Sequence, residues 1–255
     1  MKTASLICFV FALVFGTNHV LAQKSVKPQS SGGQLVVCDS NTTTYRYLLL
    51  LPAKYGKKKQ QWPVILRLHG ADRRGNDLRK LEKNDLLKPS VEDSNFPFII
   101  VCPQCPNGQM WSSKLLIDFL DNIAARYNVD ANRIYVTGPS MGGRGTWDLA
   151  CDYPERFAAI APICGAGRSE DACRLKNIPV WAFHGAEDEI VPLEESQTMV
   201  NAIKACGGNA RLTVYPKMGH GGSNASGNTV KTLTYANKEL YDWFLKHTKT
   251  KGIQP

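Results

Sequence analysis

The 255-residue chain is predicted to form an α/β domain with a mostly parallel central sheet covered by helices on both faces. Three observations support this fold class. Short apolar segments rich in β-branched residues alternate along the chain with segments of helical periodicity. After an N-terminal segment, residues 23–255 are long enough for one domain with a large core. Near the middle, a turn of the pattern Gly-x-Ser-x-Gly at residues 138–142 lies between a predicted strand and a predicted helix.

The first 22 residues have the pattern of a secretory signal peptide. Lys2 gives a positive start, residues 6–15 are apolar, and residues 20–22 end in a small residue before Gln23. The apolar run is too short to span a bilayer. We therefore expect removal of residues 1–22 and export of a single catalytic domain, residues 23–255, with no membrane span.

The chain is basic, but its basic residues do not form the pattern typical of a nucleic-acid-binding surface. The chain carries +9, and the predicted signal segment contributes Lys2 and no acid, so the exported chain carries +8. Many lysines cluster at residues 57–59 and 246–251, as in a solvated loop and a tail. No basic stripe alternates with aromatic residues, so we expect no nucleic-acid partner.

The cysteines indicate disulfide bonding rather than metal binding. Cys8 leaves with the predicted signal peptide, and seven cysteines remain, an odd number that leaves at least one free thiol in a monomer. Export permits disulfides, and we expect one pair among Cys164, Cys173 and Cys206. The Cys102-Pro-Gln-Cys105 spacing lacks a second pair to complete a zinc site, so we expect no metal.

The apolar pattern gives the elements in order. A polar stretch at residues 23–36 is expected to be a loose leader. Strands are predicted at residues 45–51, 63–70, 96–101, 134–136, 157–163, 179–183 and 211–215. Pro103 is expected to end the third of these.

Helices and loops fill the spaces between these strands. Ser112 or Ser113 is a candidate cap for a helix whose apolar face repeats through Ile123. Further helices are expected after the central turn, at residues 193–206 and at residues 240–247. Short helical turns are expected within residues 71–95, and an inserted polar loop at residues 223–231.

The central turn has the features of a nucleophile elbow. The strand at residues 134–136 leads into Gly138-Pro-Ser140-Met-Gly142, and a helix follows. A serine at the apex of such a turn needs a strained backbone, and a Cβ at either flanking glycine would collide with a neighbouring strand or helix. Ser140 is therefore the predicted nucleophile, against the alternative of an ordinary Ser-Gly-rich loop.

A serine hydroxyl becomes a good nucleophile only when a base accepts its proton. Of the five histidines, His220 alone lies in a glycine-flanked loop after the last strand. His69 and His184 each end a strand in a His-Gly pair, where the side chain is expected to support the turn. His220 is thus the predicted base, and its alternative is a solvated loop histidine.

The acid is expected after the strand at residues 179–183. Three adjacent carboxylates, Glu187, Asp188 and Glu189, are candidates, and position alone leaves the choice open. Whichever it is, the chain order of serine, acid and histidine is that of the α/β-hydrolase triad.

Two backbone N–H groups are candidates for the oxyanion hole. Met141 follows the nucleophile, and Ala71 follows the strand that ends at Gly70. Trp111 is a candidate wall for the acyl or sugar group of a substrate. The alternative for Trp111 is core packing.

The motifs together resemble the secreted carboxylesterase/phospholipase-like and predicted-peptidase branch of the α/β hydrolases, relatives of dienelactone hydrolases and feruloyl esterases. The matching segments extend from about residue 45 to residue 245 and include residues 68–75, 102–106, 130–143, 153–159, 161–165, 179–185 and 218–220. The resemblance implies that the aspartate of the His-Gly-x-x-Asp-x-x-Val-Pro segment, here Asp188, is the acid. The chain departs from the family pattern after His220, where the polar loop follows, and near Arg73 and Arg74.

The expected function is hydrolysis of carboxylic esters. Residues 163–177 are too few for a lid domain, and an open site suits short acyl or aromatic esters of the acetyl or feruloyl type, including esters of polysaccharides. A secreted serine peptidase of the prolyl-oligopeptidase type and a non-catalytic binding protein are the alternatives. We expect no cofactor and a monomer.

Overall fold

The computed structural model describes residues 24–25, 34–38, 45–56, 60–82, 85–86 and 93–249. The predicted signal peptide, residues 1–22, lies outside the described residues. Within the described part of the chain, no helix combines the length and the apolar character needed to cross a bilayer.

A single twisted sheet runs through the molecule. The described strands lie side by side in the order β1-β2-β3-β5-β4-β6-β7-β8-β9. Their bounds are β1 Lys24–Ser25, β2 Gln34–Cys38, β3 Arg46–Leu51, β4 Trp62–Arg67, β5 Ile99–Gln104, β6 Val129–Pro139, β7 Ala159–Ile163, β8 Val180–Gly185 and β9 Ala210–Tyr215. Neighbours from β5 to β9 pair in parallel, whereas β1, β2 and β3 add an antiparallel edge.

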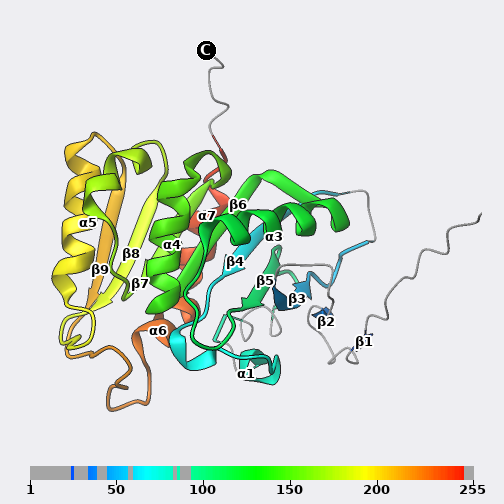
Figure 1. Cartoon of the computed structure of the whole chain (residues 1–255), viewed down its shortest axis with the longest axis horizontal. Helices are drawn as coiled ribbons and strands as arrows, with labels where there is room; N and C mark the ends of the chain where they lie inside the picture. The colour runs from blue at the N-terminus through cyan, green and yellow to red at the C-terminus, as the bar shows by residue number, and fades with distance from the viewer. Residues whose placement is uncertain are drawn as a thin grey trace, which may run out of the picture.

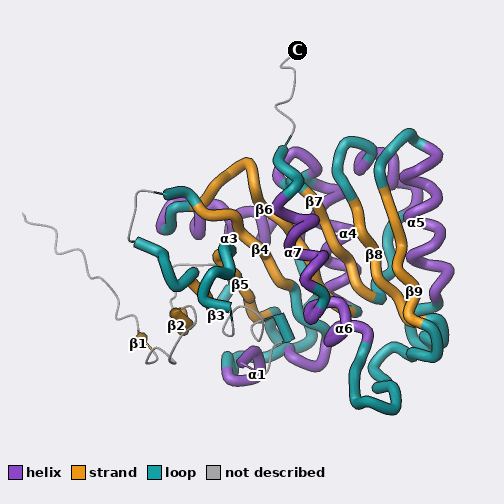
Figure 2. Tube along the Cα trace, turned by 180° about the vertical axis from the view of Figure 1, so that it is seen from behind, coloured by secondary structure: helices purple, strands orange, loops and turns teal. Residues whose placement is uncertain are grey.

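Helices cover both faces of this sheet. Helices α3, α4 and α5 lie in front of the sheet in Figure 1, and α6 and α7 lie in front of it in Figure 2, the opposite view. Their bounds are α1 Arg79–Glu82, α3 Ser113–Arg126, α4 Met141–Asp152, α5 Leu193–Ala205, α6 Val230–Ala236 and α7 Lys238–Leu245. Short 3-10 helices form at η1 Ala71–Arg73, η2 Pro154–Arg156 and η3 Ser169–Leu175. The predicted α/β fold is confirmed.

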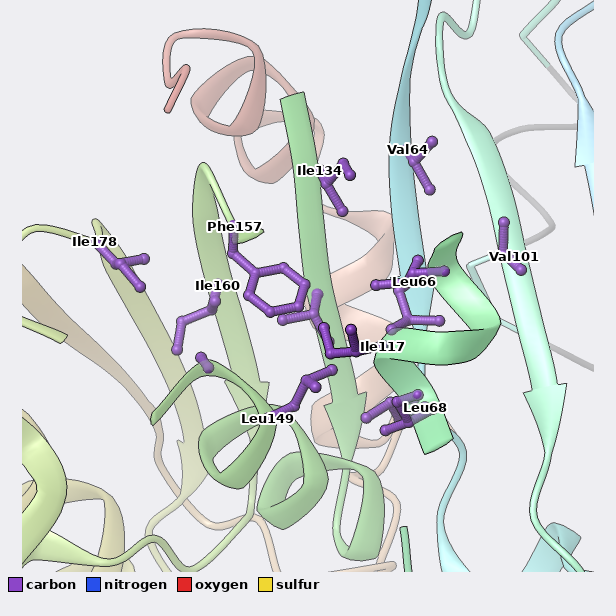
Figure 3. Packing of buried hydrophobic residues seen from close by; sticks show 14 of the residues in the cluster. Val64, Leu66, Leu68, Val101, Ile117, Ile134, Leu149, Phe157, Ile160 and Ile178 are labelled. Carbon is purple, nitrogen blue, oxygen red and sulfur yellow. The ribbon is translucent and has the colours of Figure 1, made fainter. Parts of the chain in front are cut away.

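The core has two layers because successive strand side chains point to opposite faces. In β4, Val64 and Leu66 belong to the cluster under α3, α4 and α5, whereas Ile65 belongs to the cluster under α6 and α7. All six residues of β4 are buried, as expected for a central parallel strand covered on both sides. Figure 3 shows the first cluster, with Ile117 and Leu149 lying against the strand side chains.

The disulfide pairing and the length of one connection agree with the predictions from the sequence. A disulfide joins Cys173 in η3 to Cys206 after α5, which confirms a pair among the three predicted cysteines. The link between β7 and β8 holds only η3, so no lid domain interrupts the sheet here.

The prediction of a loose leader at residues 23–36 was wrong for its described parts. β1 and β2 pair antiparallel, and β2 pairs with β3. Leu35, Val36 and Val37 favour a strand, but the run is short, and its partner β3 lies beyond residues 39–44.

Two element boundaries also differ. Strand β5 continues through Pro103 to Gln104. Its pairing with β4 ends at Val101, so the proline lies where β5 pairs with β3 alone. The second difference is α6, which begins at Val230 inside the predicted polar loop, capped by the Thr229 hydroxyl that accepts a hydrogen bond from the Thr232 N–H.

Candidate active site

Ser140 stands at the apex of a sharp turn between β6 and α4. Its φ of 56° lies in the left-handed region, which is strained for a residue other than glycine. The Ser140 N–H donates to the Ile163 carbonyl of β7 at 2.8 Å, and the Ser140 carbonyl accepts from the Arg144 N–H at 2.9 Å. The strained turn is thus held by the neighbouring strand on one side and the helix on the other.

The two glycines of the turn allow a very close backbone approach. A Cβ on Gly138 would lie 2.3 Å from the Leu68 carbonyl oxygen, and one on Gly142 would lie 2.1 Å from the same atom. Real Cβ atoms do not come this close to an oxygen, so both positions require glycine.

His220 lies in the loop after β9 and contacts the serine directly. Its Nε2 is 2.7 Å from Ser140 Oγ, and its Nδ1 is 2.8 Å from Asp188 Oδ2. Because an ionised carboxylate only accepts hydrogen bonds, Nδ1 carries the proton and Nε2 is left to accept from the hydroxyl. This is the tautomer that a general base needs.

Asp188 is the carboxylate that contacts His220. It is 7% exposed, and its Oδ1 accepts the N–H groups of Ile190 and Val191 at 3.0 and 2.9 Å. The flanking carboxylates Glu187 and Glu189 are exposed. The structure therefore brings Ser140, Asp188 and His220 together, although their catalytic roles remain a prediction.

His69 supports the turn after β4, as expected for a His-Gly pair. Its Nε2 accepts from the Cys105 N–H at 2.9 Å, so its Nδ1 carries the proton and donates to the Gly70 carbonyl at 2.6 Å. Burial, above all, lowers the pKa of His69 to about 4, so the ring is neutral at neutral pH.

The predicted oxyanion donors lie on two adjoining segments. Met141 is the first residue of α4, where N–H groups lack helical partners. Ala71 opens η1 directly after Gly70, and a Cβ on Gly70 would lie 3.7 Å from Ser140 Cβ. The Ala71 N–H belongs to the same peptide as the Gly70 carbonyl, which His69 holds in place. The role of these two N–H groups remains a prediction.

Trp111 is half-buried beside this segment. Its Nε1 donates to the His69 carbonyl at 3.2 Å, and its ring packs against the rings of His69 and Tyr45. The side chain also lines a groove of about 730 Å³ together with residues of α3, α4 and η3. Ser140, Asp188 and His220 do not line this groove. Core packing is therefore part of its role, and substrate contact remains a prediction.

Sequence reasoning missed one part of the site. Asp188 has a buried thiol, Cys164, and a buried imidazole, His184, as further neighbours. The His184-Gly pair was a local signal, but the proximity of Cys164 depends on the pairing of β7 with β8, which no local pattern shows.

Comparison with known proteins places the chain in a family. Residues 108–248, more than half of the chain, match the sequence profile of the dienelactone hydrolase family. The chain belongs to this family. The matched region begins before α3 and contains the elbow and the segments that carry Asp188 and His220.

Named relatives of this dienelactone hydrolase family member include esterases. Feruloyl esterase B of Neurospora crassa is 30% identical over 145 residues, which cover 51% of this chain and 47% of that enzyme. The bifunctional acetylxylan esterase/xylanase XynS20E of Neocallimastix patriciarum is 24% identical over 209 residues, which cover 74% of this chain and 28% of that enzyme. The chain spans about half the length of the curated relatives it matches, or less.

Among solved structures, a thermostable esterase has a TM-score of 0.67 and 28% sequence identity. The match covers 85% of this chain and 63% of that one. The α/β-hydrolase fold of this family member agrees with the predicted fold class.

Proposed function

We propose that this protein is a serine carboxylic-ester hydrolase that acts through an acyl-enzyme on short acyl or aromatic esters, of the acetyl or feruloyl type, including esters carried by polysaccharides. The observation that carries the proposal is the continuous hydrogen-bonded series from Ser140 Oγ through His220 to Asp188, at 2.7 and 2.8 Å, with the serine on a strained elbow.

The geometry supports a two-step reaction. His220 Nε2 takes the hydroxyl proton as Ser140 Oγ bonds to the ester carbonyl carbon, and Asp188 stabilises the imidazolium. Collapse of the tetrahedral intermediate breaks the bond to the alcohol, which leaves with the proton from Nε2. Water, deprotonated by the same nitrogen, then releases the acid and regenerates the serine.

The oxygen of the tetrahedral intermediate is negative and needs fixed donors. We assign this role to the N–H groups of Met141 and Ala71. Both act through the backbone, so side-chain replacement at these positions leaves the donors in place.

The proposed substrate class rests on the named relatives. The named relatives include a feruloyl esterase and an acetylxylan esterase. The disulfide fits an exported protein.

The test combines active-site labelling with turnover. The purified protein is treated with a fluorophosphonate, its intact mass is measured, and hydrolysis of a nitrophenyl acetate is followed in parallel. A single adduct on Ser140, with turnover lost in step, is expected, and feruloyl and acetyl carbohydrate esters should then be hydrolysed in preference to peptides. Folded protein with neither adduct nor turnover would overturn the proposal.

A further inference from the structure

Beside the carboxylate of the proposed triad lie a buried thiol and a buried imidazole that the proposed reaction does not use. Ligand-type atoms of Cys164, His184 and Asp188 all lie within 4.8 Å of one another. The exposed fractions of the three residues are 2%, 0% and 7%. A buried thiol and a buried imidazole next to a carboxylate need a physical explanation.

The spacing of the three groups resembles a metal site, but their protons argue for hydrogen bonding. His184 Nε2 is 2.8 Å from the Val191 carbonyl, which can only accept, so this nitrogen carries a proton and has no lone pair for a cation. Burial, chiefly, and the adjacent Asp188 carboxylate raise the pKa of Cys164 to about 12. Cys164 is therefore a thiol at neutral pH and can donate to the carboxylate. The His184 Nε2–H, which donates to Val191, also lies 3.3 Å from Asp188 Oδ2.

Both carboxylate oxygens of Asp188 accept hydrogen bonds. Oδ1 accepts two backbone N–H groups. Oδ2 accepts from His220 Nδ1 at 2.8 Å and lies 3.3 Å from His184 Nε2, and the Cys164 thiol lies within 4.8 Å of the carboxylate. A carboxylate has about four lone-pair positions, so Asp188 cannot rotate without losing partners.

Cys164 also lies between the strand that leads to Asp188 and the turn that carries Ser140. It follows β7, its φ is 46°, and its N–H donates to the Phe183 carbonyl of β8 at 2.9 Å. The preceding residue, Ile163, accepts the N–H of Ser140. A strained non-glycine residue at this junction fixes where the thiol points.

We propose that His184 and Cys164 are positioning residues that act on His220 through Asp188, by fixing the carboxylate and by drawing negative charge away from the oxygen that faces the imidazole. The inference rests on the proposed function. The sign of the effect follows from the charge. Without these donors, Oδ2 carries more charge toward His220, so the imidazolium becomes more stable and the acid limb of the pH profile moves to higher pH.

Other titratable groups lie on the elements packed around this series, including Asp72, whose Oδ1 would lie 3.0 Å from a Cβ on Gly70. His184 comes from β8 and Cys164 from the end of β7, while Tyr215 of β9 approaches Cys164. Glu187 and Glu189 flank Asp188 in the chain and are exposed. Because both side chains are exposed, water and salt screen their charges, and their electrostatic effect on His220 is weak.

The test is the pH profile of kcat/KM for a nitrophenyl acetate in matched variants. Cys164→Ala and His184→Leu should move the acid limb upward by about half a pH unit. Cys164→Ser and His184→Gln keep a donor and should leave the limb near its original place. Cys151→Ala removes a buried thiol away from the triad and should change stability without moving the limb.

A second readout does not need turnover. The proton on His220 Nδ1, hydrogen-bonded to a carboxylate, gives a downfield proton NMR resonance that should shift in Cys164→Ala and stay in Cys151→Ala. If the original protein hydrolyses esters with a His220-dependent acid limb, but Cys164→Ala and His184→Leu leave limb and resonance unchanged, the inference is overturned. If the unmodified protein has no turnover and Ser140 takes no label, the proposed function itself has failed.

Discussion

At the scale of single residues, the contacts of His220 predict which substitutions should lower kcat most. Ser140→Ala should lower kcat by about 10⁶-fold, because no other nucleophile lies within hydrogen-bond reach of Nε2 in the described site. Asp188→Asn should cost about 10⁴-fold, since the asparagine favours the wrong imidazole tautomer. Single-turnover and steady-state rates measure both, with circular dichroism to confirm folding.

The matched control for the acid is its neighbour. Glu189→Gln changes the same chemistry one residue away on an exposed side chain, so its rate should stay within about twofold of the original. A Glu189→Gln protein as slow as Asp188→Asn would mean that the wrong carboxylate has been chosen.

Single residues also differ in how well the sequence alone could predict their place in the site. Ser140 and His220 could be predicted because each has a local signature, an elbow and a glycine-flanked loop. Asp188 could not be separated from Glu187 and Glu189 by position, because the distinction lies in which side chain turns inward. Cys164 carries no local signal for its place beside the acid, which strand pairing decides.

At the scale of elements, the elbow should tolerate no added atom. Gly142→Ala places a Cβ 2.1 Å from the Leu68 carbonyl oxygen and should lower the free energy of unfolding by at least about 2 kcal/mol. Gly222→Ala, where nothing lies within 4 Å, should change it by less than about 0.5 kcal/mol. Urea unfolding of the two variants compares them directly, and equal losses would contradict the packing argument.

The turn after β4 should make stability depend on pH. The folded pKa of His69, about 4, lies below the unfolded value of 6.5, so the unfolded chain binds the proton first as pH falls. This contribution, about 3 kcal/mol at most, is fully present above pH 6.5 and is lost progressively toward pH 4.

The variant His69→Asn isolates this term, because asparagine can still donate to the Gly70 carbonyl but does not titrate. Urea unfolding at a series of pH values should show a shallower decline for this variant between pH 6.5 and 4. Parallel curves for the two proteins would rule out the assigned pKa.

Elements with strong periodicity could be predicted, and those that depend on distant partners could not. Helix α3 has a repeating apolar face and a serine cap, and both were visible in the sequence. Strand β2 is too short to stand out until β3 lies beside it. Helix α6 begins inside a polar stretch, where Thr229 was the one local sign of a cap.

At the scale of the whole molecule, one covalent link should contribute measurably to stability. The Cys173–Cys206 disulfide closes a loop of 33 residues in sequence separation, and loss of that constraint on the unfolded chain corresponds to about 3–4 kcal/mol. The double variant Cys173→Ser, Cys206→Ser should unfold at lower urea while keeping its kcat at 25 °C, because neither sulfur contacts the triad. A loss of kcat in folded protein would show that the link also shapes the site.

The overall architecture was the most predictable property, because the alternation of strands and helices along the chain sets the layer arrangement. The antiparallel edge formed by β1 and β2 was missed for the opposite reason. Its place in the sheet rests on a pairing with β3, not on a pattern within the residues themselves.

The segment between His220 and α6 has a further consequence for redesign and divergence. The residues on either side of this segment pack closely against Gly185 of β8. A Cβ added to Gly185 would lie 2.2 Å from the Met218 carbonyl oxygen and 3.2 Å from the Val230 side chain. Gly221, Gly222 and Gly227, between these anchors, have open space around them. Insertions and deletions there can alter the rim of the proposed catalytic centre without moving His220, so this is the natural place to graft diversified sequences when selecting for new acyl or alcohol specificities.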